Sequence, residues 1–319
     1  ITSRQPGFTP EVRAELTAGN YNYFQIKGAV SGPLSDNVAA RIAFSGTRRD
    51  GTVHNITTGH DDNNLSNIGL RAQLLWKPSS NLEINLAGDY SHQNTECCAT
   101  VFVKYVPTQK ALNRQYPAIY QVATGSAYTT NPASQDPYAR ISDVDAELRA
   151  KQSIGGASLR AKLNLGAGTL TSISAWRFWD WDPSNDRDFT ALPITTKSQN
   201  PSKQRQFTQE IRCNQHSDKL DFQVGTFYYY QKINTDGLQV QGSAATRWLL
   251  SPNASATNPY NLDVINGLSS TNTIRLRNTS WSVYGPRKLP RRRSRSPSSA
   301  CCCPKATRPA SRRGMSRTT

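Results

Sequence analysis

The sequence predicts an all-β protein: an antiparallel transmembrane β-barrel, of which about ten strands are present, with long extracellular loops and a disordered basic tail. Apolar and polar residues alternate with a period of two in many segments, which is typical of strands with one apolar face. Short and long connections alternate between these segments. No run of 18 apolar residues occurs, so transmembrane helices are excluded. In lipid, only helices and closed barrels pair all backbone hydrogen-bonding groups. Because helices are excluded, a closed barrel is the expected spanning structure.

The alternating segments are predicted to be strands. In each of them the apolar residues share one face and the polar residues share the other. They are residues 12–18, 24–30, 38–44, 68–76, 82–86 and 220–224.

The connections between the predicted strands alternate strictly in length. Short turns are expected at 32–37, 77–81, 166–168 and 215–219, and long polar stretches at 46–66, 92–144, 182–203 and 232–274. A soluble domain rarely contains a structureless loop of about 50 residues. Outer-membrane barrels have tight periplasmic turns and long external loops, so the alternation of short and long connections favours a barrel.

Aromatic residues gather near the long-loop ends of the predicted strands, as an interfacial girdle requires. This expected girdle contains Trp176, Trp179, Trp181, Tyr228, Tyr229 and Tyr230. In the stretch WRFWDWD, Trp179 and Trp181 fall on one face and the alternating Asp180 and Asp182 on the other. Trp176 and Phe178 do not fit a division into one aromatic and one acidic face, because period two places them on the face of the aspartates. Either a bulge or lumen-facing aromatic rings that contact a ligand would explain them.

Several of these hairpins resemble those of TonB-dependent outer-membrane receptors. The stretches GNYNYFQIKGAVSGPLSDNVAARIAFSG, GLRAQLLWKPSSNLEINLAGDYS, TLTSISAWRFWDWD and QFTQEIRCNQHSDKLDFQVGTFYYYQ resemble successive barrel hairpins of that family. The resemblance covers nearly all of residues 1–285, which we interpret as a partial barrel domain. The family fold is a 22-stranded barrel with a plugged lumen. We therefore expect fewer than half of the strands here, without the plug or the TonB box.

The resemblance implies an environment, a function and partners. It implies the outer membrane of a Gram-negative bacterium, with lipid around the barrel and TonB as the partner that drives transport in the intact receptor. It also implies active uptake of a scarce ligand such as a siderophore, cobalamin or a glycan. The residues leave a passive porin or a structural barrel open as alternatives. An energised uptake receptor is the leading hypothesis.

The C-terminal stretch 286–319 differs from the rest in composition. It holds 11 of the 38 Lys and Arg residues and no acid, so residues 1–285 hold 27 bases against 22 acids. Too few apolar residues are present there to offset the entropy of ordering, and we expect disorder. Three interpretations compete: a basic arm that binds nucleic acid, a solvated tail, and translation out of frame. The strand pattern stops at Gly285, which favours a frame shift, with no nucleic-acid partner.

The sequence offers few signs of a catalytic, cofactor-binding or metal-binding site. No HExxH, GxSxG or P-loop motif occurs, so we expect neither an enzyme nor a cofactor. The run Asp180, Asp182, Ser184, Asp186 and Asp188 is similar to a calcium loop, but the Gly and the closing Glu are missing, and a solvated charged rim is favoured. Cys97 and Cys98 are expected to form a disulfide in an oxidising compartment, rather than a soft-metal site with His92 or a cap on a lid.

Two sets of residues are predicted to serve transport. The set expected to line the lumen contains Arg41, Arg71, Glu83, Asp89, Glu210 and Arg212, although each is also compatible with a solvated wall. The set expected to bind ligand, in the lumen or in a loop, contains Arg41, Arg71, Trp176, Phe178, Asp180, Asp182 and Arg212. No metal ligand is predicted.

Overall fold

The computed structural model of the 319-residue chain describes most of residues 4–288. The described ranges are 4–101, 106–127, 136–216, 221–250, 264–285 and 287–288. Among these residues, no helix is both long enough and apolar enough to cross a membrane.

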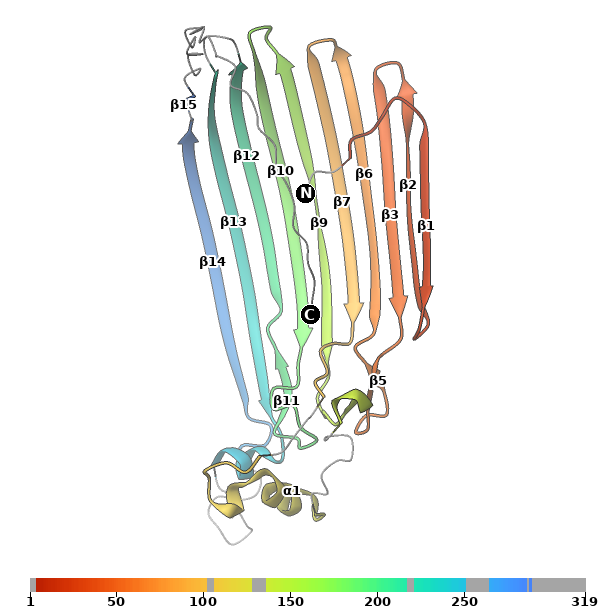
Figure 1. Cartoon of the computed structure of the whole chain (residues 1–319). Coiled ribbons are helices and arrows are strands. Elements are labelled where there is room, and N and C mark those ends of the chain that lie inside the picture. Colours follow the sequence, from red (N-terminus) through yellow and green to blue (C-terminus); the bar gives the residue numbers. More distant parts are fainter. Residues whose placement is uncertain are drawn as a thin grey trace, which may run out of the picture.

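A single large antiparallel sheet dominates the structure (Figure 1). Its ten long strands are β1 (Glu11–Gly19), β2 (Tyr23–Ser35), β3 (Val38–Arg49), β6 (Leu65–Ser79), β7 (Leu82–Thr95), β9 (Arg149–Asn164), β10 (Gly168–Ser184), β12 (Ser202–His216), β13 (Asp221–Gln241) and β14 (Ser269–Tyr284). They are hydrogen-bonded in the order of the sequence. The prediction of about ten antiparallel strands is thereby confirmed.

Shorter elements occupy the connections. Strands β4 (Val53–Asn55), β5 (Asp61–Asp62) and β8 (Ile141–Ser142) form a small separate sheet, and β11 (Thr195–Gln199) pairs with the end of β13. Helix α1 (Tyr116–Thr124) has a proline in its first turn and ends at Gly125 in the left-handed conformation. Single helical turns cover Leu112–Arg114, Pro137–Ala139 and Thr246–Leu250.

The connections separate by length onto the two ends of the sheet. Residues 36–37, 80–81 and 165–167 form tight turns at one end. The long connections, with α1, lie at the other end (Figure 1). Strict alternation is wrong at one position, because residues 20–22 join β1 to β2 at the long-connection end. There Asp50 donates its backbone N–H to the Tyr21 carbonyl at 2.9 Å, so the short link packs against the following long connection. Much of the predicted turn at 215–219 lies outside the described residues.

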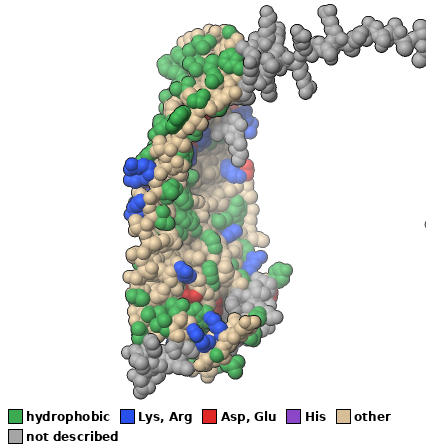
Figure 2. Space-filling model, turned by 90° about the vertical axis from the view of Figure 1, so that its left-hand side faces the viewer, with side chains coloured by type: hydrophobic (Ala, Val, Ile, Leu, Met, Phe, Trp, Pro, Cys, Tyr) green, Lys and Arg blue, Asp and Glu red, His purple; other side chains and the backbone are tan. Residues whose placement is uncertain are grey.

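The two faces of the sheet have opposite character. Large apolar side chains on one face are solvent-accessible, among them Ile42, Ile68, Leu70, Leu86 and Leu159. The alternate positions on the same strands carry polar residues such as Arg71 and Gln73, and Gln73 is only 8 % exposed. This is the reverse of a soluble sheet, in which the apolar face is buried. Figure 2 shows the sheet as a curved wall that is hollowed along one side. We call the apolar face the outer face and the polar face the inner face.

The segment before β1 crosses the inner face near the tight turns. The backbone N–H of Gly7 donates to Ser31 Oγ at 3.1 Å, and the Lys77 ammonium lies 5.5 Å from the centre of the Phe8 ring. Ser31 and Lys77 both belong to the inner face by register. The chain therefore approaches the first strand from the inner side of the sheet.

The strand pairing continues slightly beyond the predicted domain boundary at 285. Arg287–Lys288 form strand β15 and pair with Phe222 and Asp221 of β13. The first residues of the predicted basic tail thus pair with β13, and the boundary at 285/286 stays a prediction. The remainder of the basic tail, 289–319, lies outside the described residues.

Candidate functional site

The lumen-facing residues predicted from the sequence all lie on the inner face. Register joins Arg41 to Gln73 as Cα partners, and Arg71 to Asp89. Glu83 accepts a hydrogen bond from Arg160 at 2.9 Å. Glu210 forms an ion pair with Arg212 and also accepts a hydrogen bond from the Tyr284 hydroxyl. The inner face thus carries paired charges, among them the predicted ligand-binding residues Arg71 and Arg212. The third predicted arginine on this face, Arg41, has the neutral Gln73 as its Cα partner.

The four other predicted ligand-binding residues do not face the hollow. Strand β10 pairs without a bulge with β9 from Thr169 to Ser184, so its side chains alternate strictly. Trp176, Phe178, Asp180 and Asp182 therefore share the outer face, and Trp176 is 46 % exposed. The interpretation of Trp176 and Phe178 as lumen-facing rings is wrong, because no bulge shifts the register.

The outer positions instead form an aromatic row. Phe178 contacts Tyr90 and Trp176, with ring centres 6.3 and 5.5 Å apart. Phe207 lies beside Tyr228 at 6.4 Å. The predicted girdle is thus partly correct, since Trp176, Tyr228 and Tyr230 are on the outer face by register. Trp179, Trp181 and Tyr229 are on the inner face and do not belong to it.

Trp179 and Trp181 form a flat aromatic surface at the long-connection end of the inner face. Their rings are stacked, with centres 6.1 Å apart and planes inclined by 14°. The Trp179 indole N–H donates to Gln152 Oε1 at 3.1 Å, and the Gln152 amide donates in turn to Gln93 at 2.9 Å. This chain of amides fixes the orientation of Trp179 and leaves polar groups beside the rings.

A cavity of about 510 Å³ lies over this tryptophan pair. Its lining also includes Gln93, Gln152, Phe189 and the adjacent cysteines Cys97 and Cys98. The volume is within the range of small-molecule sites, which are mostly apolar with a few polar groups. The cavity is therefore suited to a ligand with a planar or apolar portion and hydrogen-bonding groups at its edge.

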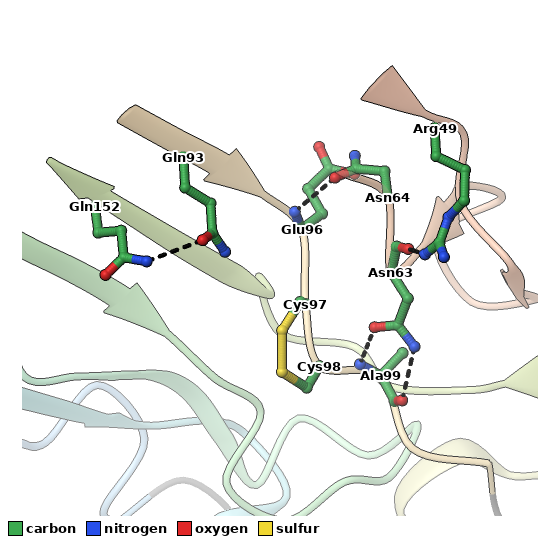
Figure 3. Close-up of a disulfide and its surroundings, with 9 residues drawn as sticks. All are labelled: Arg49, Asn63, Asn64, Gln93, Glu96, Cys97, Cys98, Ala99 and Gln152. Atoms are coloured by element: carbon green, nitrogen blue, oxygen red, sulfur yellow. Dashed lines mark hydrogen bonds between the residues drawn. A yellow bond between two sulfur atoms is a disulfide. The ribbon is translucent and has the colours of Figure 1, made fainter. Parts of the chain in front are cut away.

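One wall of the cavity is a disulfide between Cys97 and Cys98 (Figure 3). Asn63 holds this segment in place: its side-chain amide donates to the Ala99 carbonyl at 3.1 Å, and its side-chain oxygen accepts from the Ala99 N–H at 2.9 Å. The alternative soft-metal partner, His92, instead contacts Ser153 at 2.9 Å. The disulfide segment is thus a fixed part of the cavity wall.

Three carboxylates support the neighbouring loop. Ligand oxygens of Asp145, Asp186 and Asp188 lie within 4.8 Å of one another. Asp186 is fully buried and accepts four backbone N–H groups, including that of Phe189 at 2.8 Å. Asp180 and Asp182, which the sequence grouped with this run, form ion pairs with Arg205 and Arg149 on the outer face. The cluster therefore joins two loops, with Asp186 as the acceptor at its centre.

Burial changes the acidity of the cluster. Burial, together with the nearby charges of Asp186 and Asp188, raises the pKa of Asp145 to about 7. Burial also raises the pKa of Asp188 to about 6 and that of Asp186 above its ordinary value. At neutral pH the cluster therefore retains part of its protons, which reduces repulsion among the three groups.

Sequence reasoning did not assign Trp179, Trp181, Gln152 or Asp145 to a ligand site, and it expected both tryptophans in the aromatic girdle. The alternation of WRFWDWD already placed both tryptophans on one face. The identity of that face depends on counting from a fixed turn, and the turn at 165–167 supplies that reference. Asp145 lies 41 residues before Asp186, and no local pattern connects them.

Comparison with solved structures identifies the architecture. The siderophore receptor PiuA of Acinetobacter baumannii matches with a TM-score of 0.56 at 12 % identity, covering 89 % of this chain and 40 % of that receptor. The ferric yersiniabactin uptake receptor FyuA of Yersinia pestis matches with a TM-score of 0.54 at 13 % identity, covering 89 % of this chain and 44 % of that receptor. The ferripyoverdine receptor of Pseudomonas aeruginosa gives a TM-score of 0.53 at 11 % identity, covering 88 % of this chain and 35 % of that receptor.

The fold of this chain is therefore that of part of the barrel wall of outer-membrane receptors. The chain spans less than half the length of these receptors. No protein-family model matches the sequence, and no curated protein matches it.

Proposed function

We propose that the chain forms part of the barrel wall of an outer-membrane uptake receptor, in which the inner face lines the path of a scarce ligand. The observation that carries this proposal is the inverted sheet. Leu159 on the outer face is 46 % exposed, whereas Arg160 beside it forms an ion pair on the inner face. An exposed apolar face on long strands is suited to lipid, and a charged inner face is suited to water.

The tryptophan cavity is the proposed contact site for the ligand. It lies at the long-connection end, where external loops of a receptor meet incoming ligands. The neighbours PiuA, FyuA and the ferripyoverdine receptor are siderophore receptors or uptake receptors by name. Their shared fold supports a siderophore as the first ligand to test, with cobalamin and glycans as the other candidates. Energy would come from TonB acting on a plug in the intact receptor.

The path of residues 4–10 is compatible with this arrangement. That segment reaches β1 along the inner face, where Gly7 contacts Ser31. A plug inside the lumen would connect to the wall from this side. The uptake role of the charged residues on the inner face, including Arg41, Arg71 and Arg212, is part of the same proposal.

Uptake by the intact receptor tests the proposal. The double variant Trp179→Ala/Trp181→Ala should reduce uptake of labelled ferric siderophore by about 5-fold to 150-fold, since stacking on each ring contributes about 0.5–1.5 kcal/mol. Trp176→Ala, on the outer face of the same strand, is the matched control and should retain uptake. Unchanged transport of siderophore, cobalamin and glycan by the double variant would contradict the cavity as the ligand site. Uptake that persists without energy would favour a passive porin.

A further inference from the structure

One register row of the inner face runs across all ten long strands without an ionisable side chain. It lies at the long-connection end and includes Trp181. Successive Cα partners in this row from β6 to β13 are Asn67, Gln93, Gln152, Trp181, Ser202 and Thr235. Its members on β1, β2, β3 and β14 are uncharged as well. We call this set the neutral row.

The cavity over the tryptophan pair also lacks a free charge. Arg149 is the only ionisable residue in its described lining, because the two cysteines are joined in a disulfide. The Arg149 guanidinium forms ion pairs with Glu147 at 2.8 Å and with Asp182 at 3.1 Å, so two carboxylates offset one base. An anionic ligand, such as a ferric catecholate, would meet no uncompensated cation among the described residues of this lining. The cavity is therefore suited to an uncharged ligand.

The neutral row offers hydrogen-bond donors and acceptors to such a ligand. Gln152 donates to Gln93 Oε1 at 2.9 Å, which leaves the Gln93 amide nitrogen without a partner among the described residues (Figure 3). Asn67 Oδ1 is buried and accepts no hydrogen bond from a described residue. Amide groups can bind both the hydrogen and the oxygen of a hydroxyl group. These unpaired groups therefore match a ligand that is rich in hydroxyl groups.

Trp179 and Trp181 complement the amides with an apolar surface. Their nearly parallel rings have negative faces, which attract the weakly positive C–H groups of a ligand. A sugar ring has C–H groups on its faces and hydroxyl groups around its edge. It can therefore lie on the tryptophans while its edge bonds to Gln93 and Gln152. A cavity of about 510 Å³ is large enough for a short oligosaccharide.

We propose that the tryptophan cavity and the neutral row bind an uncharged oligosaccharide. This inference rests on the proposed uptake function and names the ligand class for the same site. Among the three candidate ligand classes, the absence of a free cation selects the glycan. Chains of β-linked glucose fit best, because every ring substituent is equatorial and both ring faces stay apolar.

The test measures binding of cellotriose to the full chain, refolded in detergent micelles, by isothermal titration. The unaltered chain should bind cellotriose with an affinity that salt does not change, because no ion pair forms. The Trp179→Ala/Trp181→Ala variant should bind it about 5-fold to 150-fold more weakly. A trisaccharide of the same linkage with a carboxylate at C6 of each ring should bind the unaltered chain more weakly. Tighter binding of this anionic sugar would contradict an uncharged ligand.

Gln93→Leu tests the hydrogen bonds of the neutral row. It should weaken cellotriose binding about fivefold, which is typical of one hydrogen bond. The matched control is Gln223→Leu, since Gln223 lies on the inner face of β13 near the tight-turn end, with Asn214 as its Cα partner. This control should bind cellotriose as the unaltered chain does. Equal loss in both variants would show a general effect of removing an inner-face amide and would contradict the inference. Far-UV circular dichroism shows whether each variant retains the sheet.

A second probe separates this inference from the proposed function. It is the ferric complex of 2,3-dihydroxybenzoate, an anionic siderophore analogue, which should bind more weakly than cellotriose. If the ferric complex binds, depends on Trp179 and Trp181, and cellotriose does not bind, the glycan is contradicted and the uptake function is not. A folded chain that binds neither probe contradicts the inference and also the tryptophan cavity as the ligand site.

Discussion

Arg177 reaches across a whole strand to form a two-pronged ion pair with Asp89. Its two guanidinium nitrogens donate to the two carboxylate oxygens of Asp89 at 2.8 Å each. Strand β9 lies between β7 and β10, and the residue between the partners is Gly156. Because glycine has no side chain, the arginine can lie over it. Arg71 donates to the same carboxylate at 2.9 Å, so three strands are joined on the inner face.

Gly156→Val should disrupt this ion pair. A Cβ at this position would lie 2.2 Å from the Trp176 carbonyl oxygen and 3.1 Å from Arg177 Cγ. Overpacking of this kind costs about 1–3 kcal/mol. We expect the urea midpoint of the refolded chain to fall accordingly. The control is Gly88→Val, where the nearest atom to a Cβ is 3.7 Å away. A similar loss in both variants would show that glycine in a strand, rather than the ion pair, sets the stability.

A double-mutant cycle should detect the coupling between Asp89 and Arg177. The side chains are 23 % and 40 % exposed, so solvent screening limits the interaction to about 1 kcal/mol. Asp89→Asn should cost more than Arg177→Gln, because it also removes the partner of Arg71. Urea unfolding of the two single variants and the double variant measures the coupling. Strict additivity would mean that the two groups do not interact in solution.

An arginine on the outer face should prevent insertion, whereas one on the inner face should be tolerated. Leu159 is on the outer face, five residues before the end of β9 at Asn164, and Ser158 is on the inner face opposite Ala87 and Ala175. Leu159→Arg should destabilise the inserted state by about 2–4 kcal/mol. Ser158→Arg should insert normally, because its small neighbours leave room. Reversible unfolding from vesicles measures the free energy of the inserted state for both variants. Equal tolerance of the two arginines would indicate a soluble sheet.

The carboxylate cluster should make the loop beside the cavity less stable as pH rises. The pKa of Asp145 is raised to about 7 in the folded chain, so folding favours its protonated form. The resulting stability is complete below pH about 4 and is lost progressively as pH rises to about 7. Hydrogen-exchange protection at Ala146 and Phe189 should decrease over this interval.

Asp145→Asn provides the comparison for this pH dependence. The variant removes the group with the largest raised pKa and should increase loop protection at pH 8 by more than about tenfold, because the rise from 3.8 to about 7 exceeds one pKa unit. A pH profile identical to that of the unaltered chain would assign the dependence to other groups.

Much of the sheet could be predicted because period two is a local signal. The alternation at 68–76 and 82–86 corresponds to β6 and β7, and the turns at 36–37 and 80–81 are as short as expected. The short link at 20–22 could not be predicted, because the length of one external connection depends on its packing against another. The paired charges on the inner face were found for the same local reason, since Arg71 and Asp89 fall at polar positions.

The candidate site was harder to predict because each strand residue has two possible faces. A shift of one residue exchanges the faces, and the aromatic run from Trp176 to Trp181 has rings on both. The local sequence is equally compatible with an inner Trp179 and outer Phe178 and with the reverse arrangement. The cavity also depends on Cys97 and Gln152, which belong to segments distant from β10 in the sequence. Contacts of this range are set by the register of the whole sheet.

The alternation of side chains along β10 tests most directly the claim that the apolar face of the sheet contacts lipid. Single spin labels at residues 170–175 would be placed in a chain with its native cysteines replaced by serine, reconstituted in vesicles, and tested for contact with oxygen and with a water-soluble nickel chelate. Labels at Leu170, Ser172 and Ser174 should encounter oxygen, and labels at Thr171, Ile173 and Ala175 should encounter the chelate. A profile without a period of two, or one with the faces exchanged, would contradict a sheet that presents its apolar face to lipid.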